Sequence, residues 1–342
     1  MIEKTINGNT YKLPNDLNPF KLALYVHLIN WKWREITKDP GINIHKGEPI
    51  EYDAILPESV KKNYPIIYPD ILQMLKDHNT KFPFRMHTFF NHVASSQAAN
   101  INLFLPILKS NKADEIFRNI KKDFDRVARN ELDNGFRIEY WDEPSGNLND
   151  KTEVSGTDSD IAIAYYNKDD ELCLWLIEHK LAEAEFTECG GFKSNGRNPL
   201  LHDCTMCFSD ILKKKDFCYY HKVRKFKYWD FTESNKSFFV NHSQFPECPF
   251  KGGMNQLWRN QVLGLSIESD HRLPYKHVYF SVVRHPDNIH LTKTINNYKS
   301  LVDYNDKFSE HTSMEFIDAA QSLNDSTLKK WINWYKELYI NI

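Results

Sequence analysis

The stretch Gly156–Lys180, GTDSDIAIAYYNKDDELCLWLIEHK, decides how the rest of the sequence is interpreted. It contains two runs of β-forming residues, Ile161–Tyr166 and Leu172–Ile177, on either side of a polar segment centred on Asp169. Two such runs joined by a short polar segment are typical of a β-hairpin with a longer loop. We therefore expect a hairpin whose strands pair symmetrically about Asp169.

Two acids and a lysine converge at the open end of this hairpin. Symmetric pairing places Asp160 directly opposite Glu178, with Cβ atoms roughly 4.5–5.5 Å apart. Because side chains alternate along a strand, Glu178 and Lys180 share a face, and His179 points to the other. Two like charges that face each other are destabilising unless a cation lies between them. The spacing therefore predicts a divalent metal held by Asp160 and Glu178 beside Lys180.

The alternatives to these acids are Asp158 and Glu139. Asp158 lies two residues before Asp160 on the same strand face, but we expect it in the turn that precedes the strand. Glu139, on a neighbouring predicted strand, could supply a third acid, although a surface position is the favoured interpretation. The apolar run before Glu178 indicates a strand covered on both faces, so a charge at its end needs a partner.

This pattern resembles the D…(D/E)-x-K signature of the PD-(D/E)XK nuclease superfamily, with Asp160 as the first acid and Glu178-His179-Lys180 as its second part. The proline of that signature is absent, and Gly156-Thr157-Asp158-Ser159 takes its place. The string SSQAANINLFLPIL from Ser95 and the stretch Pro249–Asn260 resemble a bacterial group of restriction endonucleases in this superfamily. The resemblance implies a restriction-endonuclease-like αβββαβ core and the carbonyl of His179 as a further metal ligand.

The remaining apolar patterns agree with that order of elements. They predict helices over Met86–Leu108 and Lys112–Leu132, a strand over Phe136–Trp141, a helix over Met254–Ile267 and a strand over His277–Arg284. Two helices follow, around Met314–Leu323 and Ser326–Tyr339. We therefore expect an α/β (α+β) protein with a mixed sheet. Its parts are a mostly helical N-terminal segment packed on the core (1–111), the nuclease core (112–290) with a cysteine-bearing insertion (about 187–253), and a helical C-terminal segment (291–342).

The composition of the chain limits the classes of protein to which it can belong. The chain has 342 residues and a formal net charge of −2, so bulk charge does not indicate a nucleic-acid binder, and phosphate binding must come from local clusters. No apolar run approaches eighteen residues, and the N-terminus lacks the apolar segment of a signal peptide. We therefore expect a cytoplasmic protein without a membrane partner. Six cysteines in such a chain favour core thiols or metal ligands over disulfides.

The insertion concentrates the cysteines. Five of the six fall within it: Cys189, Cys204, Cys207, Cys218 and Cys248. Four thiolates could hold Zn²⁺ or a [4Fe–4S] cluster, which would leave one spare, either Cys204 or Cys207. Buried thiols without a metal carry equal weight, because the spacings match no standard zinc ribbon.

Basic residues interleave with aromatic ones in the same insertion. Lys213, Lys214, Lys215 and Arg224 could neutralise phosphates while neighbouring aromatic rings stack on unpaired bases, and a solvated charge run is an equal alternative. Gln256, Arg259 and Asn260, on the predicted helix after the insertion, could reach a scissile phosphate; N-terminal capping and surface polarity are the alternative.

These residues are suited to the hydrolysis of a phosphodiester bond. Hard oxygen ligands favour Mg²⁺ or Mn²⁺, and Lys180 would orient the attacking water or stabilise the developing charge. We expect an Mg²⁺-dependent endonuclease that acts on DNA, and the resemblance implies a role in restriction or phage defence. Two alternatives stay open: a non-catalytic module that binds nucleic acid or a partner through the cysteine site, and a nuclease that acts on RNA. A homodimer is one open oligomeric state.

Overall fold

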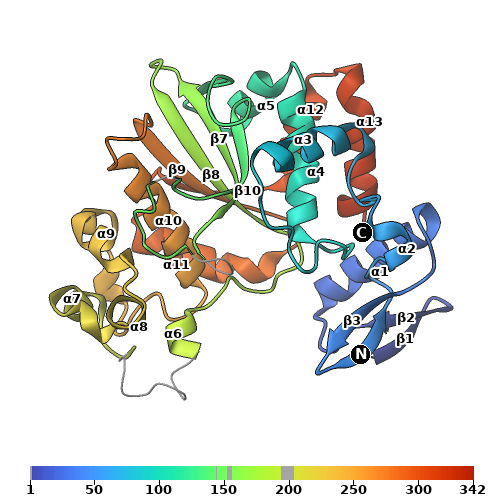
Figure 1. Ribbon diagram of the computed structural model, residues 1–342, viewed down its shortest axis with the longest axis horizontal. Helices are drawn as coiled ribbons and strands as arrows, with labels where there is room; N and C mark the ends of the chain where they lie inside the picture. The colour runs from blue at the N-terminus through green and yellow to red at the C-terminus, as the bar shows by residue number, and fades with distance from the viewer. Residues whose placement is uncertain (1, 144, 152–155, 194–203) are drawn as a thin grey trace.

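A mixed sheet forms the centre of the molecule (Figure 1). The structure, a computed structural model, describes residues 2–143, 145–151, 156–193 and 204–342. The strands lie in the order β10-β9-β8-β7-β5. Strands β5 and β6 pair with the same edge of β7, each with a different half of it. Within the described residues the sheet has six strands, β5 (Phe124–Val127), β6 (Phe136–Tyr140), β7 (Ser159–Asn167), β8 (Leu172–Lys180), β9 (His277–Arg284) and β10 (Phe308–Thr312).

The predicted hairpin is confirmed, and so is its register. Strands β7 and β8 pair antiparallel up to Ile161 opposite Ile177, with the register symmetric about Asp169. Beyond that pair, side-chain oxygens of β7 accept the backbone N–H groups of β8. The hydroxyl of Ser159 accepts the N–H of Ile177 at 2.8 Å, and the Asp160 carboxylate accepts the next outward-facing N–H of β8 at 2.6 Å. The pairing of β7 with β8 therefore gives way to a polar site, while β8 stays paired with β9 as far as Lys180.

The two faces of the sheet pack against separate hydrophobic cores. Along β8 the side chains alternate, so that Trp175 lies in one core and Leu176 in the other. The side chains of Glu178 and Lys180 lie on the same face of β8 as Leu176, and that of His179 lies on the same face as Trp175. The acid and the lysine thus point to one face of the sheet, as predicted.

Helices cover both faces (Figure 1). The Trp175 face packs against α4 (Ser96–Lys109), α5 (Ala113–Ile120), α12 (Ser313–Ser322) and α13 (Ser326–Tyr335), which continues as a π-helical turn, Lys336–Ile340. The Leu176 face packs against α10 (Met254–Glu268) and α11 (Thr292–Leu301). Next to α10 lie the short helices of the insertion, α6 (Gly190–Lys193), α7 (Phe208–Lys213), α8 (Tyr219–Lys222) and α9 (Tyr228–Ser234). The α+β class is as expected, and no helix in the described ranges combines the length and apolarity needed to cross a membrane.

The N-terminal module (residues 2–95) is less helical than predicted. It contains two hairpins as well as helices, β1 (Ile2–Ile6) with β2 (Asn9–Leu13), β3 (Gly41–His45) with β4 (Glu48–Tyr52), α1 (Pro19–Glu35), α2 (Glu58–Lys61) and α3 (Leu72–Lys81). Positive backbone φ angles at Asn7-Gly8 and Lys46-Gly47 form the tight turns of these hairpins. The module docks on the C-terminal turn, where His27 contacts the Glu337 carbonyl at 2.9 Å.

The predicted helix over Lys112–Leu132 is wrong in its second half. Helix α5 ends at Ile120, and the next strand, β5, adds one element to the expected order. The helical spacing of apolar residues continues to Phe124, but the Phe124 ring stacks on Tyr165 of β7, with ring centroids 4.8 Å apart. Pairing with the sheet therefore overrides the local helical pattern.

The helix predicted over Met86–Leu108 also begins later than expected. The first residue of α4 is Ser96, because Ser95 caps the helix by accepting the N–H of Ala98 at 3.3 Å. This late start places the polar end of α4 beside the open end of the β7–β8 hairpin.

Gly264 allows α10 to lie close to the sheet, which gives a stability prediction. A Cβ atom at this position would stand 3.2 Å from Val278 Cγ1 and 3.6 Å from Leu176 Cδ1. We expect Gly264→Leu to lower the free energy of unfolding by roughly 1–3 kcal/mol, because the larger side chain forces the helix outward. Urea denaturation would measure this loss. Gly252→Ala, where nothing lies within 4 Å of the added atom, is the control and should stay near wild type; equal stability of both variants would contradict the prediction.

Candidate active site

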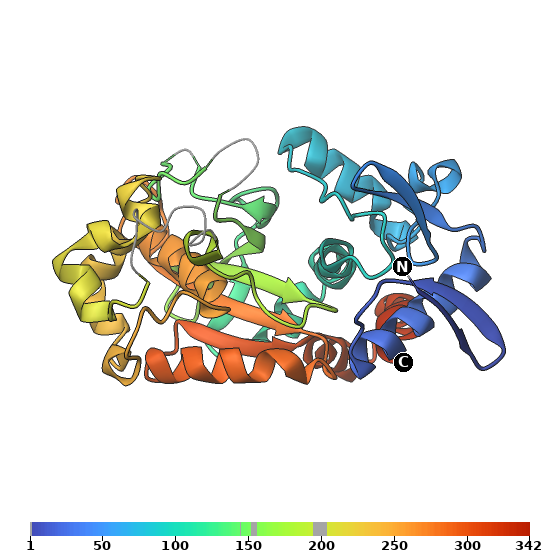
Figure 2. The same ribbon diagram turned by 90° about the horizontal axis from the view of Figure 1, so that it is seen from below.

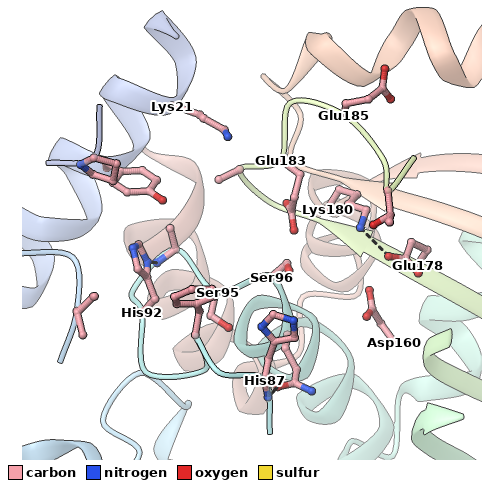
Figure 3. A pocket seen from close by; sticks show the side chains of 18 of the residues that line it. Lys21, His87, His92, Ser95, Ser96, Asp160, Glu178, Lys180, Glu183 and Glu185 are labelled. Carbon is pink, nitrogen blue, oxygen red and sulfur yellow. Dashed lines mark hydrogen bonds and ion pairs between the residues drawn. The ribbon is translucent and has the colours of Figure 1, made fainter. Parts of the chain in front are cut away.

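The N-terminal module stands beside the sheet in Figure 2. A cleft of about 620 Å³ lies between that module and the open end of the β7–β8 hairpin (Figure 3). Asp160, Glu178 and Lys180 line one side of it. Lys21 of α1 and His92 lie on the opposite side in Figure 3. The structure therefore brings the three predicted residues together and adds a second wall from a part of the chain in which no site residue was predicted.

The Glu178 carboxylate is held by three donors. Its Oε1 accepts from Lys180 Nζ and from Gln256 Nε2, both at 2.7 Å, and its Oε2 accepts from Asn260 Nδ2 at 2.8 Å. Only 3% of Glu178 and 8% of Lys180 is exposed. Three donors at these distances hold the buried carboxylate in one orientation.

Asp160 is oriented by backbone groups. Its Oδ2 accepts the N–H of His179 at 2.6 Å, and its own carbonyl accepts from Asn100 Nδ2 of α4 at 3.1 Å. Burial raises the pKa of Asp160 well above its usual range, and the charges of Glu178 and Glu139 raise it further. The pocket thus holds more carboxylate charge than Lys180 compensates.

Glu139 belongs to the site, contrary to the surface position favoured from the sequence. The register of β6 with β7, in which Ile138 faces Ile161, places Glu139 beside Asp160. Its backbone is left-handed, with φ of 50°, and its carboxylate accepts from Gln97 Nε2 at 2.6 Å. Burial raises the pKa of Glu139 to about 8, with help from the charges of Asp158 and Glu178. An uncommon backbone conformation at a cleft is the kind of feature found at functional sites.

Lys180 is surrounded by carboxylates. Burial acts to lower the pKa of its ammonium group, but the charges of Glu178, Glu183 and Asp160 outweigh burial and raise the pKa above its usual value. Glu183 follows β8, points into the cleft in Figure 3, and accepts the N–H of Leu181 at 2.8 Å. Sequence reasoning missed Glu183, although an acid three residues after the lysine was a usable signal.

Asp158, the alternative first acid, lines the same cleft. Its carboxylate is half-buried and forms an ion pair with Lys151 at 3.3 Å. Asp160 differs because it contacts the strand that carries Glu178. The arrangement therefore favours Asp160 as the acid that works with Glu178.

Asn260, one of the three residues predicted on α10, holds Glu178, and the other two have different surroundings. Gln256 lines the cleft, and its amide bridges Glu178 and the N–H of Thr187, which it accepts at 3.0 Å. Arg259 turns away, donating to Thr157 Oγ1 at 3.0 Å and to the Gly156 carbonyl at 2.5 Å. Arg259 thus fixes the segment that leads into β7, a structural role that leaves Gln256 as the predicted residue at the cleft.

The basic residues of the insertion lie elsewhere on the surface. Lys213 and Lys214 are exposed, Lys215 forms ion pairs with Asp230 and Glu233, and Arg224 lies over the Phe226 ring. None of the predicted residues Lys213, Lys214, Lys215 and Arg224, all of them described, lines the cleft.

Gly253 shapes the rim of the cleft. A Cβ atom there would stand 2.3 Å from Oε1 of Glu185, so only glycine leaves room for that carboxylate. Glu185 Oε2 accepts from Thr294 Oγ1 at 2.7 Å. The carboxylate is therefore held at the edge of the site, in contact with α11.

The cysteines of the insertion form no disulfide. In the described part of the chain, no three His, Cys, Asp or Glu side chains are placed to hold a metal ion together.

Comparison with known proteins adds a family. No curated protein and no solved structure matches the chain. A family model described as "Restriction Endonuclease associating with ARP" matches residues 40–340, which include the sheet, most residues that line the cleft and most of the N-terminal module, but not Lys21. The chain therefore belongs to this restriction endonuclease family.

Proposed function

We propose that this protein is a metal-dependent nuclease that hydrolyses phosphodiester bonds in DNA. The observation that carries the proposal is the convergence of Asp160, Glu178 and Lys180 in one cleft at the end of a buried hairpin. The family supports nuclease chemistry. The D…E-x-K arrangement and the order helix, strands, helix, strand support a PD-(D/E)XK-like core, to which β5 is an addition.

The carboxylate oxygens fit a hard divalent cation such as Mg²⁺ or Mn²⁺. An ionised carboxylate has about four acceptor positions. Three of those on Glu178 are used by its donors, and Oδ2 of Asp160 accepts one N–H. Asp160 and Glu178 are the residues that would hold the ion. When bound, such an ion polarises a phosphoryl oxygen and lowers the pKa of a coordinated water.

The remaining residues position the reacting groups. Lys180 presents a charged ammonium group 2.7 Å from Glu178, where it can orient an attacking water or stabilise charge on a phosphate. Gln256 and Asn260 keep the Glu178 carboxylate in one orientation. Lys21, on the opposite wall, supplies a positive charge from the N-terminal module toward a bound backbone. A role in restriction, in the cytoplasm, is part of this proposal, and the family's description supports restriction.

Substitution of the three residues tests the function. Purified protein is incubated with plasmid, linear duplex DNA, single-stranded DNA and RNA in Mg²⁺ or Mn²⁺. We expect Asp160→Asn, Glu178→Gln and Lys180→Met each to slow DNA cleavage by about 10²-fold or more, because each removes a group at the reacting centre. EDTA should abolish cleavage, and Asp169→Asn, in the exposed hairpin loop, should retain it. Equal rates for the wild type and all three variants would overturn the proposal, and cleavage of RNA alone would overturn the DNA assignment.

Asn260 should act as a positioning residue. Replacing Asn260 with Leu removes the donor to Glu178 Oε2, so we expect the Mg²⁺ concentration for half-maximal cleavage to rise about 10–100-fold. Saturating metal should restore most of the rate. Asn255→Leu is a matched control, since Asn255 is equally buried in α10 and its amide has no hydrogen-bond partner among the described residues. An unchanged metal requirement in Asn260→Leu would contradict this role.

The raised pKa of Glu139 predicts how stability depends on pH in EDTA. Between about pH 4.5 and pH 8 the folded protein keeps a proton on Glu139 that the unfolded chain has lost. The free energy of unfolding should therefore fall as the pH rises through this range. We expect Glu139→Gln to make that fall shallower, measured by urea denaturation at several pH values. The exposed-site variant Glu3→Gln should keep the wild-type slope, and an unchanged slope in Glu139→Gln would refute the prediction.

A further inference from the structure

The two walls of the cleft differ in their chemistry. On the sheet side carboxylates dominate, namely those of Glu139, Asp158, Asp160, Glu178, Glu183 and Glu185. The lining residues of the N-terminal module, all of them described, include no acid; they contribute aromatic rings, imidazoles and one ammonium group, those of Tyr25, Tyr52, Phe89, His87, His92 and Lys21. One wall is therefore suited to a cation, whereas the other presents π faces and a positive charge, the groups that bind bases and phosphates.

An anchored turn holds Phe89 at the module wall. Phe89 is 48% exposed, whereas the next residue, Phe90, is buried, and so is Val93. The N–H of Val93 donates to the carbonyl of Ala54 at 2.8 Å, which ties the turn to the rest of the module. The exposed ring is thus a fixed feature of the folded chain, and a ring that is already in place loses little conformational entropy when a ligand stacks on it.

Gln97 connects this turn to the acids. Its Oε1 accepts the N–H of His87 at 2.8 Å, and its Nε2 donates to Oε1 of Glu139 at 2.6 Å. Gln97 is itself buried at the start of α4, and Glu139 belongs to β6, which pairs with the strand of Asp160. The aromatic turn and the acidic wall therefore hold a defined position relative to each other, as a site that orients one nucleotide requires.

Lys21 supplies the positive charge of the module wall. Its ammonium group forms no ion pair with another described residue, whereas Lys180 Nζ lies 2.7 Å from Glu178. Lys21 is fixed in the first turn of α1, where its N–H donates to Oδ1 of Asn18 at 2.8 Å. An unpaired ammonium group at a cleft is available to neutralise a phosphate.

The volume of the cleft limits what it can enclose. A cleft of about 620 Å³ has the size of a site for a drug-sized molecule, which corresponds to roughly one or two nucleotides. An intact duplex is too large to be enclosed there, because its major groove alone is about 12 Å wide. A base can also stack on the Phe89 ring only after it has left the stack of a duplex. Size and chemistry therefore favour an unpaired strand.

We propose that the N-terminal module binds an unpaired DNA strand, in which Phe89 stacks on a base beside the scissile phosphate and Lys21 contacts a neighbouring phosphate. This inference rests on the proposed nuclease function and specifies its substrate: single-stranded DNA, or duplex DNA where the strands have separated. Intact duplex DNA is then a poor substrate, since base pairs must open before a strand enters the cleft. Phe89 takes no part in the chemical step.

Binding measured without metal tests the strand preference separately from cleavage. The full chain is titrated in EDTA into a fluorescently labelled single-stranded oligonucleotide and into the blunt-ended duplex of the same sequence, and fluorescence anisotropy gives both dissociation constants. We expect the single strand to bind at least about 10-fold more tightly, because only its bases are free to stack. Equal or tighter binding of the duplex, or no binding of the single strand, would overturn the proposal.

Substitution of Phe89 identifies the stacking ring. We expect Phe89→Ala to weaken single-strand binding about 10-fold and Phe89→Trp to retain it, with duplex binding unchanged in both. Tyr304→Ala is the matched control, because Tyr304 carries an exposed ring that does not line the cleft. Wild-type affinity for the single strand in Phe89→Ala would refute the role of this ring.

The phosphate contact of Lys21 is measured by salt dependence. We expect Lys21→Met to make the slope of log K against log salt for the single strand shallower by about 0.7, the value for one phosphate contact. Lys4→Met removes the same charge from an exposed position of β1 outside the cleft and should keep the wild-type slope. An unchanged slope in Lys21→Met would contradict the contact.

The two proposals fail separately. If Asp160→Asn, Glu178→Gln and Lys180→Met all cleaved DNA at the wild-type rate, the proposed nuclease function would be overturned. The binding constants, which are measured in EDTA, would be unaffected by that result.

Discussion

Like charges lie close together where the pairing of β7 with β8 ends. The other residues of the site compensate this charge. Where main-chain pairing stops, Asp160 takes over one backbone donor and faces the strand position of Glu178. Carboxylates so close raise the free energy of the folded chain unless positive groups or donors compensate them. Lys180, two amides of α10 and the capped start of α4 all act on this charge. Several helices and strands therefore contribute to one polar corner of the sheet.

The hairpin and its charged end could be predicted because they depend on local information. A symmetric turn at Asp169 and the alternation of side chains sufficed to place Asp160, Glu178 and Lys180. Glu139 could not be placed in this way, since its position comes from the register of β6, which only the folded sheet defines. The opposite wall was likewise inaccessible to local patterns, because residues of the N-terminal module reach the cleft through packing against the C-terminal turn.

The incorrect helix boundary has the same origin. The apolar residues after Lys112 have the spacing of a helix as far as Phe124. Nothing in that stretch of sequence shows that the segment can pair with the free edge of β7 instead. The five insertion cysteines pose a related problem: the sequence allowed a metal group or buried thiols with equal weight, and only the fold separates Cys207 from the four that share a cavity. Local patterns thus identified the chemical groups, whereas long-range pairing decided which of them meet.

Gly253 has a consequence for how this site can change during evolution. Its missing side chain is the only reason that the Glu185 carboxylate can rest against Thr294. Any larger residue would displace that carboxylate, so the negative charge at the cleft rim would change position. The electrostatic potential that an approaching anion meets would change with it. A substitution at one position without a side chain would thereby alter the cleft, although that position contributes no chemical group of its own.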